Sequence, residues 1–264
     1  MNDKQLSLTD SHCHLDFNEL SSQLDSLLSA CQNKNINRLI VPAIAPSNWQ
    51  AVLDISKTNT IQIHPCLGVH PWFLDDLELS CIADLKSELI KNKSRIIALG
   101  EAGIDGTIAK EKNNISKQID FFDAQLAVAD SLSLPVIVHH RRSHQEVVSC
   151  LKKYKLSQAG IIHAFSGSYQ QAKQYLDLGF KLGIGGTITY PRAAKTIKTV
   201  SKLPLDSIVL ETDAPAMPLY GYQGKTNSPE RIIDVLEALS EIRNESKETL
   251  AIATEANLEQ CLFT

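Results

Sequence analysis

Six side chains of the kinds that bind divalent metal ions stand where apolar, β-branched runs of the sequence stop. They are His12, His14, Glu101, His139, His163 and Asp213. Imidazole nitrogens and carboxylate oxygens in this mixture suit divalent cations. His12 and His14 are two residues apart, so an extended backbone presents both rings on the same face. If the runs are strands of one sheet, their ends bring the six side chains together and predict a metal centre.

The number of candidate ligands indicates two ions rather than one. A single catalytic metal takes three or four protein ligands, whereas this sequence offers four imidazoles and two carboxylates. Two ions about 3.5–4 Å apart use such a set economically, and Glu101 or Asp213 can bridge them because a carboxylate has two oxygens. Such a pair activates water and stabilises the oxygens of a bond under hydrolysis. The pattern therefore predicts a hydrolase.

The two carboxylates are also the predicted catalytic groups. Asp213, near the end of DSIVLETD, is expected to take a proton from the attacking water while it contacts a metal ion. Glu101 is expected to contribute as a ligand shared by the ions. The structural alternative for Asp213 is an Asx turn or a helix cap ahead of Ala214 and Pro215.

Residues beside the predicted ligands indicate how a substrate is held. His70, in GVHP, is expected to contact substrate, and the alternative is that it caps a turn. Arg141, in VHHRR, is suited to a phosphate because its guanidinium donates two parallel hydrogen bonds; the alternative is an exposed loop position. Asp105 and Glu211 are placed to orient ligating imidazoles from outside the ligand set.

One further group of charges is basic and shares a helix face. Its members recur at three- and four-residue steps; they are Arg192, Lys195, Lys198 and Lys202. A solvated helix exterior is the simpler interpretation of this stripe. The alternative is a track for phosphates that begins beside the metal centre.

The elements that must position these residues alternate between strand and helix along the whole chain. Strands are expected at 6–12, 38–44, 61–69, 95–101, 135–139, 160–163, 180–184 and 207–211. Helices are expected at 19–32, 77–91, 115–131, 143–154, 169–178, 192–201, 229–243 and 246–259, and Ser47, Ser143 and Ser168 could cap helices.

Eight such units in about 250 residues predict an α/β fold of the (β/α)8 TIM-barrel class. An open doubly wound sheet is the rival, but the first strand is not followed by G-x-G-x-x-G. A barrel also gathers all strand ends around one mouth. With no linker or compositional break, residues 1–264 are expected to form one domain.

Composition limits the function classes. Of the 264 residues, 43% are hydrophobic and 21% charged, as in an ordinary globular enzyme. The net charge of −4 means that a polyanionic substrate must be met by local basic residues and metal ions. The six scattered cysteines and the lack of a signal-peptide pattern indicate free thiols and a cytoplasmic protein. No apolar run is long enough to span a bilayer, and no obligatory protein partner is evident.

The same motifs, taken in order, resemble the TatD family of metal-dependent deoxyribonucleases, in the amidohydrolase-like barrel superfamily. The matching segments are DSHCHLD, GVHP, GEAGID, PVIVHHRR, IIHAFSG and ETDAP, and ETDAPAMPLYGYQGKTNSPE resembles one subgroup of that family. The resemblance implies metal ligands at the six residues named first, with Glu101 shared by two ions. It departs at Asp105, where family members often have a following aromatic pair and this chain has Gly106 and Thr107.

Two enzymatic hypotheses and one non-enzymatic one follow. The leading hypothesis is metal-dependent hydrolysis of phosphodiester bonds in DNA, 3′–5′ exonuclease-like, on single strands or 3′ ends, with DNA as the partner. The runner-up is hydrolysis of a carbon–nitrogen or ester bond in a small molecule by the same site. A metal-binding protein without turnover is the third. The mixed ligands admit Mg, Mn, Zn, Ni or Fe.

Overall fold

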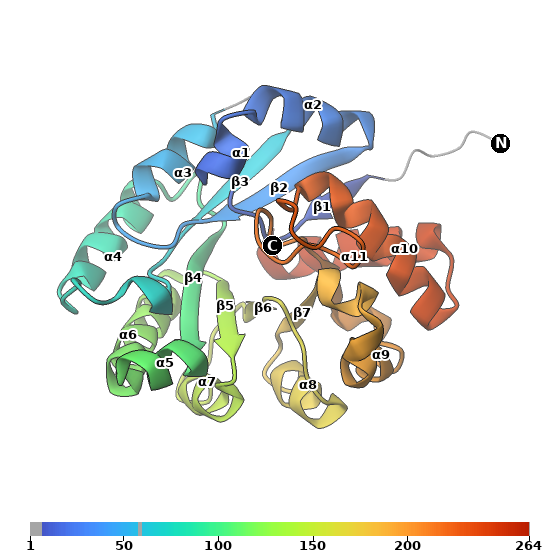
Figure 1. The fold of residues 1–264 in the computed structure, drawn as a ribbon. Helices are drawn as coiled ribbons and strands as arrows, with labels where there is room; N and C mark the ends of the chain where they lie inside the picture. The colour runs from blue at the N-terminus through green and yellow to red at the C-terminus, as the bar shows by residue number, and fades with distance from the viewer. Residues whose placement is uncertain (1–6, 58–59, 264) are drawn as a thin grey trace.

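Eight parallel strands ring the centre of the molecule and helices lie outside them in the computed structural model, which describes residues 7–57 and 60–263 (Figure 1). Each strand pairs with the next in the sequence. The strands are β1 Leu8–Asp10, β2 Ile36–Pro42, β3 Gln62–Leu67, β4 Ala98–Asp105, β5 Val136–Arg141, β6 Gly160–Ile162, β7 Lys181–Ile184 and β8 Ile208–Leu210. The predicted (β/α)8 barrel is confirmed.

The helices follow the strands on the outside of the barrel. They are α1 Asn18–Ser21, α2 Leu24–Asn33, α3 Trp49–Ile55, α4 Cys81–Lys91, α5 Gly106–Lys112, α6 Ile115–Leu132, α7 His144–Leu151, α8 Tyr169–Leu176, α9 Ala194–Val200, α10 Ile232–Arg243 and α11 Lys247–Leu262. The helix predicted at 19–32 is therefore two helices. Ser168 caps α8 as predicted, with a reciprocal bond to Gln171, but Asn48 rather than Ser47 occupies the cap position of α3.

The barrel closes between β1 and β8 through residues that follow both strands. The backbone N–H of Asp213 donates to His12 O at 2.9 Å, and that of His14 donates to Ala214 O at 2.7 Å. The buried Asp10 carboxylate accepts backbone N–H groups of His12 at 3.1 Å and Thr212 at 3.0 Å. Closure thus fixes the backbone of the predicted ligands themselves.

Apolar side chains fill the barrel below its carboxyl end. Six strands each contribute to one interior cluster with the last helix; the cluster contains Ile40, Cys66, Ala98, Ile137, Ile161, Val209, Leu258, Cys261 and Leu262. Asn257, on α11, donates to the carbonyl of Ile208 at 2.7 Å, where β8 begins. Helix α11 therefore closes the amino-terminal end of the barrel and leaves the carboxyl end open.

Several predicted strand ends are displaced from where the structure places them. Glu101 lies inside β4, which continues to Asp105, and His139 lies inside β5. His12, His163 and Asp213 follow the last paired residue of their strands. The predicted strand at 6–12 includes residue 6, which lies outside the described residues. Across residues 7–57 and 60–263, no helix combines the length and apolar character required to cross a bilayer.

Candidate metal centre

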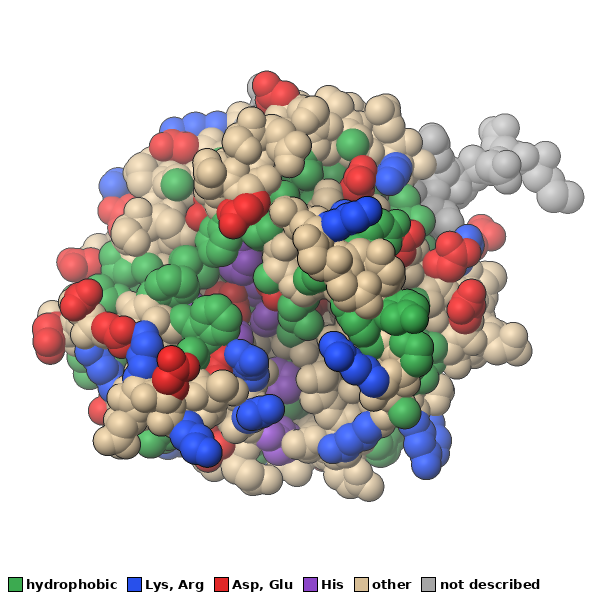
Figure 2. Space-filling model, in the orientation of Figure 1, with side chains coloured by type: hydrophobic (Ala, Val, Ile, Leu, Met, Phe, Trp, Pro, Cys, Tyr) green, Lys and Arg blue, Asp and Glu red, His purple; other side chains and the backbone are tan. Residues whose placement is uncertain are grey.

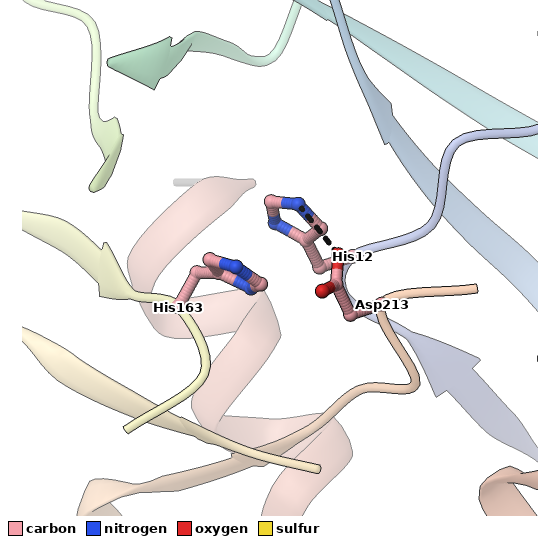
Figure 3. A group of neighbouring side chains, drawn as sticks. All are labelled: His12, His163 and Asp213. Carbon is pink, nitrogen blue, oxygen red and sulfur yellow. Dashed lines mark ion pairs between the residues drawn. The ribbon is translucent and has the colours of Figure 1, made fainter. Parts of the chain in front are cut away.

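The six predicted ligands converge at the carboxyl end of the barrel, from five different strands. His12, His14, Glu101, His139 and His163 are buried, and Asp213 is nearly so. Figure 3 shows the His12 and His163 rings lying side by side, with the Asp213 carboxylate directed at His12. The two rings stack at 3.7 Å between centroids. The alternation argument for His12 and His14 also holds, because their Nε2 atoms lie 3.2 Å apart.

Three of the potential ligand atoms, from His12, His14 and Glu101, are spaced as a tetrahedral ion requires. His12 Nε2 lies 3.1 Å from Glu101 Oε2 and 3.7 Å from Asp213 Oδ1. His14 Nε2 lies 3.5 Å and 3.6 Å from the same two oxygens. Ligand atoms about 2.0–2.1 Å from a tetrahedral ion are about 3.3–3.4 Å apart, so His12, His14 and Glu101 fit a divalent cation, and Asp213 Oδ1 lies near the same two imidazoles.

A second group gathers around the other oxygen of Glu101. Glu101 Oε1 lies 2.9 Å from His139 Nδ1 and 3.7 Å from His163 Nε2. Each oxygen of this carboxylate therefore faces a different set of imidazoles. Glu101 has the geometry expected of a shared ligand.

His70 also approaches Glu101, but its tautomer makes it a donor. Its Nδ1 accepts the backbone N–H of Trp72 at 3.2 Å, so in the neutral ring the proton is on Nε2. That Nε2 lies 3.3 Å from Glu101 Oε1. The capping interpretation of His70 is confirmed, since it caps the turn η1 (Pro71–Phe73), and its position beside Glu101 leaves substrate contact as a prediction.

Partners outside the ligand set fix the directions of the imidazoles. His14 Nδ1 lies 3.2 Å from the carbonyl of Pro42, and His163 Nδ1 lies 3.1 Å from Glu211 Oε1. Both contacts leave Nε2 free to face the centre. Glycine at 183 makes room for Glu211, because a Cβ there would lie 2.1 Å from its Oε2.

Asp105 joins the centre to the mouth of the barrel. Its Oδ2 lies 3.2 Å from His139 Nε2 and accepts the indole N–H of Trp72 at 2.7 Å. Its Oδ1 accepts two backbone N–H groups that begin α5. The sequence pointed to Asp105 as an orienting residue, and these contacts are those of such a residue. The helix start also explains Gly106, because a Cβ there would lie 2.3 Å from Arg142 O.

Buried carboxylates make the centre attractive to cations. Burial alone would raise the pKa of Glu101, but the imidazoles of His70, His12 and His163 hold it well below its usual range. Burial likewise opposes ionisation of Asp213, and the neighbouring imidazoles nevertheless lower its pKa. Two ionised carboxylates in a buried site need positive charge close by, which a bound divalent ion supplies.

The centre forms the floor of an open cavity of about 990 Å³. His70 and Arg141, the predicted substrate contacts, both line it. Arg141 Nη1 lies 3.8 Å from Asp105 Oδ2, and its side chain is 52% exposed. Figure 2 shows histidines along the floor of this hollow with Lys and Arg side chains on both sides.

Only some of the aromatic and basic residues near the barrel mouth line the main cavity. Trp72 lines the cavity with Phe17 and Phe73, whereas Tyr190 packs against Tyr220 at 5.7 Å beside a smaller hollow. Of the predicted basic stripe, Lys195 lines the main cavity, while Arg192 precedes α9 and stacks on Tyr190. The stripe is therefore not one continuous track.

Sequence reasoning did not assign His140 or His144. Alternation along β5 directs His140 away from the barrel interior, and its ring does pack on Phe165 rather than in the centre. Both histidines nevertheless line the cavity, because the loops after β5 and β6 extend it beyond the barrel axis. The signal available in the sequence was the short spacing of His139, His140 and His144.

A parallel barrel with four imidazoles and two carboxylates at its carboxyl end defines a class, the metal-dependent hydrolases of the amidohydrolase-like barrel. Within that class, the chain belongs to the TatD family: the family model described as TatD related DNase matches residues 9–263.

Relatives agree with this assignment. The metal-dependent hydrolase YjjV of Escherichia coli K12 is 39% identical over 244 residues, covering 92% of this chain and 93% of its own. A metal-dependent hydrolase of Haemophilus influenzae is 35% identical over 252 residues, covering 94% and 96%. The crystal structure of the YjjV TatD homologue superposes with a TM-score of 0.93 at 37% identity, covering 97% of this chain and 98% of that one. The chain is thus a metal-dependent hydrolase.

Proposed function

We propose that the chain is a deoxyribonuclease that hydrolyses phosphodiester bonds of single-stranded DNA or of DNA 3′ ends. The observation that carries this proposal is a shared carboxylate, Glu101, beneath a cavity that also presents Arg141 and His70. A diester phosphate needs cationic and donor groups on its oxygens, and these are the groups that this cavity supplies.

The distances between ligand atoms support two proposed ligand sets. His12, His14, Glu101 and Asp213 would hold one divalent ion, and Glu101, His139 and His163 would hold the second. When bound, the ions supply the positive charge that activates water and stabilises phosphate oxygens. Mg, Mn, Zn, Ni and Fe all accept such ligands.

The chain's own residues supply the remaining steps. Asp213, ionised because its pKa is lowered, accepts a proton from the attacking water and passes it to the leaving oxygen when the P–O bond breaks. His70 donates a hydrogen bond from Nε2 to a phosphate oxygen, since its Nδ1 accepts the backbone N–H of Trp72. The Arg141 guanidinium donates two parallel hydrogen bonds to two oxygens of the phosphate.

The alternative, hydrolysis of a carbon–nitrogen or ester bond in a small molecule, draws on one observation. Phe17, Trp72, Phe73 and Met217 are apolar residues in the lining of the cavity. A cavity of this volume would also accept a small molecule. The cations that border it, Arg141, Arg142 and Lys195, favour a polyanion.

Metal-reconstituted protein tested on single-stranded DNA beside a panel of amides and lactones separates the two hypotheses. Arg141→Lys sharpens the comparison, because a point charge cannot reproduce the guanidinium fork. We expect its kcat/KM on DNA to fall about tenfold more than on an uncharged ester, whereas the exposed Arg192→Lys control changes the two equally. Equal losses for Arg141→Lys would remove it from phosphate binding, and turnover of amides or lactones alone would overturn the nuclease proposal.

A further inference from the structure

The cavity above the metal centre extends well beyond the ligands, into a side lobe between the loops that follow β5 and β6. The side lobe is lined by His140, Arg141, Arg142, His144, Phe165 and Lys195. These residues are not part of either ligand set. The lobe is continuous with the centre, since Glu101, His139 and His163 line the same cavity.

Rings form the floor of the side lobe. The His140 ring is nearly parallel to Phe165, with centroids 5.9 Å apart, and both stand almost edge-on to Tyr175 behind them, at 5.5 and 6.5 Å. His144 meets Tyr175 edge-on at 4.9 Å. Tyr175 is fully buried and Phe165 is only 2% exposed, so these two rings support the partly exposed His140 ring, which is the face that the floor presents.

One ring of the floor is available to a ligand. His140 is partly exposed where it lines the cavity, although its Nε2 is buried and makes no hydrogen bond to any residue in 7–57 or 60–263. A partly exposed ring held in a fixed direction suits a nucleobase, which has a flat face for stacking.

Cations border the side lobe. Arg142 and Lys195 are exposed, and neither forms an ion pair with the described residues. Arg141 adds a third charge, and Glu146 is the acidic side chain that lines the same part of the cavity. Figure 2 shows Lys and Arg on both sides of the line of histidines. In a chain with a net charge of −4, this local excess of positive charge indicates an anionic ligand.

We propose that the side lobe binds the nucleotide next to the scissile phosphate, with its base on the ring floor and its own phosphate between Arg142 and Lys195. The inference rests on the proposed nuclease function and adds that the substrate is a strand with at least two phosphates. One ring floor and one set of cations match a single strand, because a base can stack here only when it is unpaired.

Binding to single-stranded DNA tests this proposal without turnover. The probe is fluorescein-labelled hexathymidylate, titrated by fluorescence anisotropy against metal-loaded Asp213→Asn at several salt concentrations. In that background, Arg142→Ala and Lys195→Ala are each expected to weaken binding about tenfold and to lower the slope of log K against log salt by about 0.7. Lys198→Ala removes an equal charge on the same helix outside the cavity, and it is expected to change neither quantity.

Hydrolysis then compares a strand with a diester that has no second phosphate, thymidine 5′-p-nitrophenyl phosphate. The loss of kcat/KM in Lys195→Ala should be about tenfold greater on hexathymidylate than on that diester. Equal losses on both substrates, or equal loss of affinity in Lys195→Ala and Lys198→Ala, would overturn the side lobe as a nucleotide site. Absence of DNA cleavage by the wild-type protein on every DNA substrate would instead overturn the nuclease function on which the inference rests.

Discussion

At the scale of single residues, the centre depends on which atom of each side chain is already occupied. His14 and His163 use Nδ1 for Pro42 and Glu211, so their Nε2 atoms face the centre. His70 uses Nδ1 for the backbone of Trp72, so its Nε2 is a donor. Three imidazoles within one small volume therefore have two different roles, ligand and hydrogen-bond donor, and the outer contact assigns each role.

Asp213→Asn tests the residue on which the proposed chemistry most depends. The amide keeps the size and one oxygen but removes the proton acceptor, so turnover is expected to fall by roughly 10²–10⁴. Metal should largely remain, because His12, His14 and Glu101 are unchanged. Elemental analysis and single-turnover kinetics on one preparation check both expectations.

The surface variant Asp177→Asn, which removes an exposed carboxylate that pairs with Lys173, is the control and should match the wild type. Full metal content with a near-normal rate in Asp213→Asn would exclude Asp213 as the proton acceptor. Loss of metal together with loss of activity would show that Asp213 acts mainly as a metal ligand.

At the scale of elements, most of the site could be predicted from the residues at the ends of the predicted strands. Residues that follow apolar runs converge whenever the runs form one parallel barrel, and this holds for His163 and Asp213 even though the strands end a residue or more earlier. Boundaries were less predictable where pairing continues beyond the apolar run. Strand β4 extends four residues past Glu101 because Asp105 still pairs with Arg141.

The side lobe was beyond prediction because it depends on loops rather than on periodicity. His140 faces outward from β5, and only the course of the following loop and α7 returns it to the cavity. The separation of Lys195 from Arg192 has a similar cause, since Pro191 starts a short 3₁₀ turn that places Arg192 before α9. Such placements are set by tertiary contacts that a single sequence does not display.

His64, on β3, provides an element-scale prediction at the opposite end of the barrel. Its ring packs edge-on to Phe263 at 4.8 Å, and the Arg38 guanidinium lies over the same phenyl ring at 4.6 Å. Burial, and to a smaller extent the charge of Arg38, lowers the pKa of His64 from its ordinary value of 6.5 to about 4. Between pH 6.5 and 4 the unfolded chain therefore binds the extra proton, and stability falls as the pH falls through this window.

Replacing His64 should make the fold less sensitive to acid. The His64 ring is partly exposed and screened by water. Between pH 6.5 and 4.5, we therefore expect the variants to lose about 1 kcal/mol less unfolding free energy than the wild type. Urea denaturation of His64→Leu and His64→Gln at both pH values measures it. Both variants lack the titrating imidazole but differ in how they pack. A change in pH dependence common to both therefore reports the proton that His64 binds in the unfolded chain. Unaltered pH dependence in both would show that His64 is not responsible.

At the scale of the whole molecule, stability and chemistry occupy opposite ends of one barrel. The amino-terminal end is closed by α11 over an apolar interior that includes Ile40, Ile137 and Val209. The carboxyl end is open and holds the buried carboxylates. The fold therefore tolerates unfavourable charge at one end because packing at the other end, and around the outside, supplies the stability.

This separation predicts that metal removal inactivates the protein without unfolding it. Each ion at about a hundredfold excess over its Kd stabilises the folded state by about 2.7 kcal/mol, so the two proposed ions together correspond to about 10–20 °C in Tm for a chain of this size. After treatment with EDTA, we expect far-ultraviolet circular dichroism to be retained, Tm to fall by that amount and hydrolysis to be lost. Adding back Mn²⁺ or Zn²⁺ should restore Tm and activity together. If the barrel instead lost its circular dichroism on chelation at 25 °C, the ions would be needed for folding, and the apolar interior beneath Glu101 would be insufficient to hold the strands.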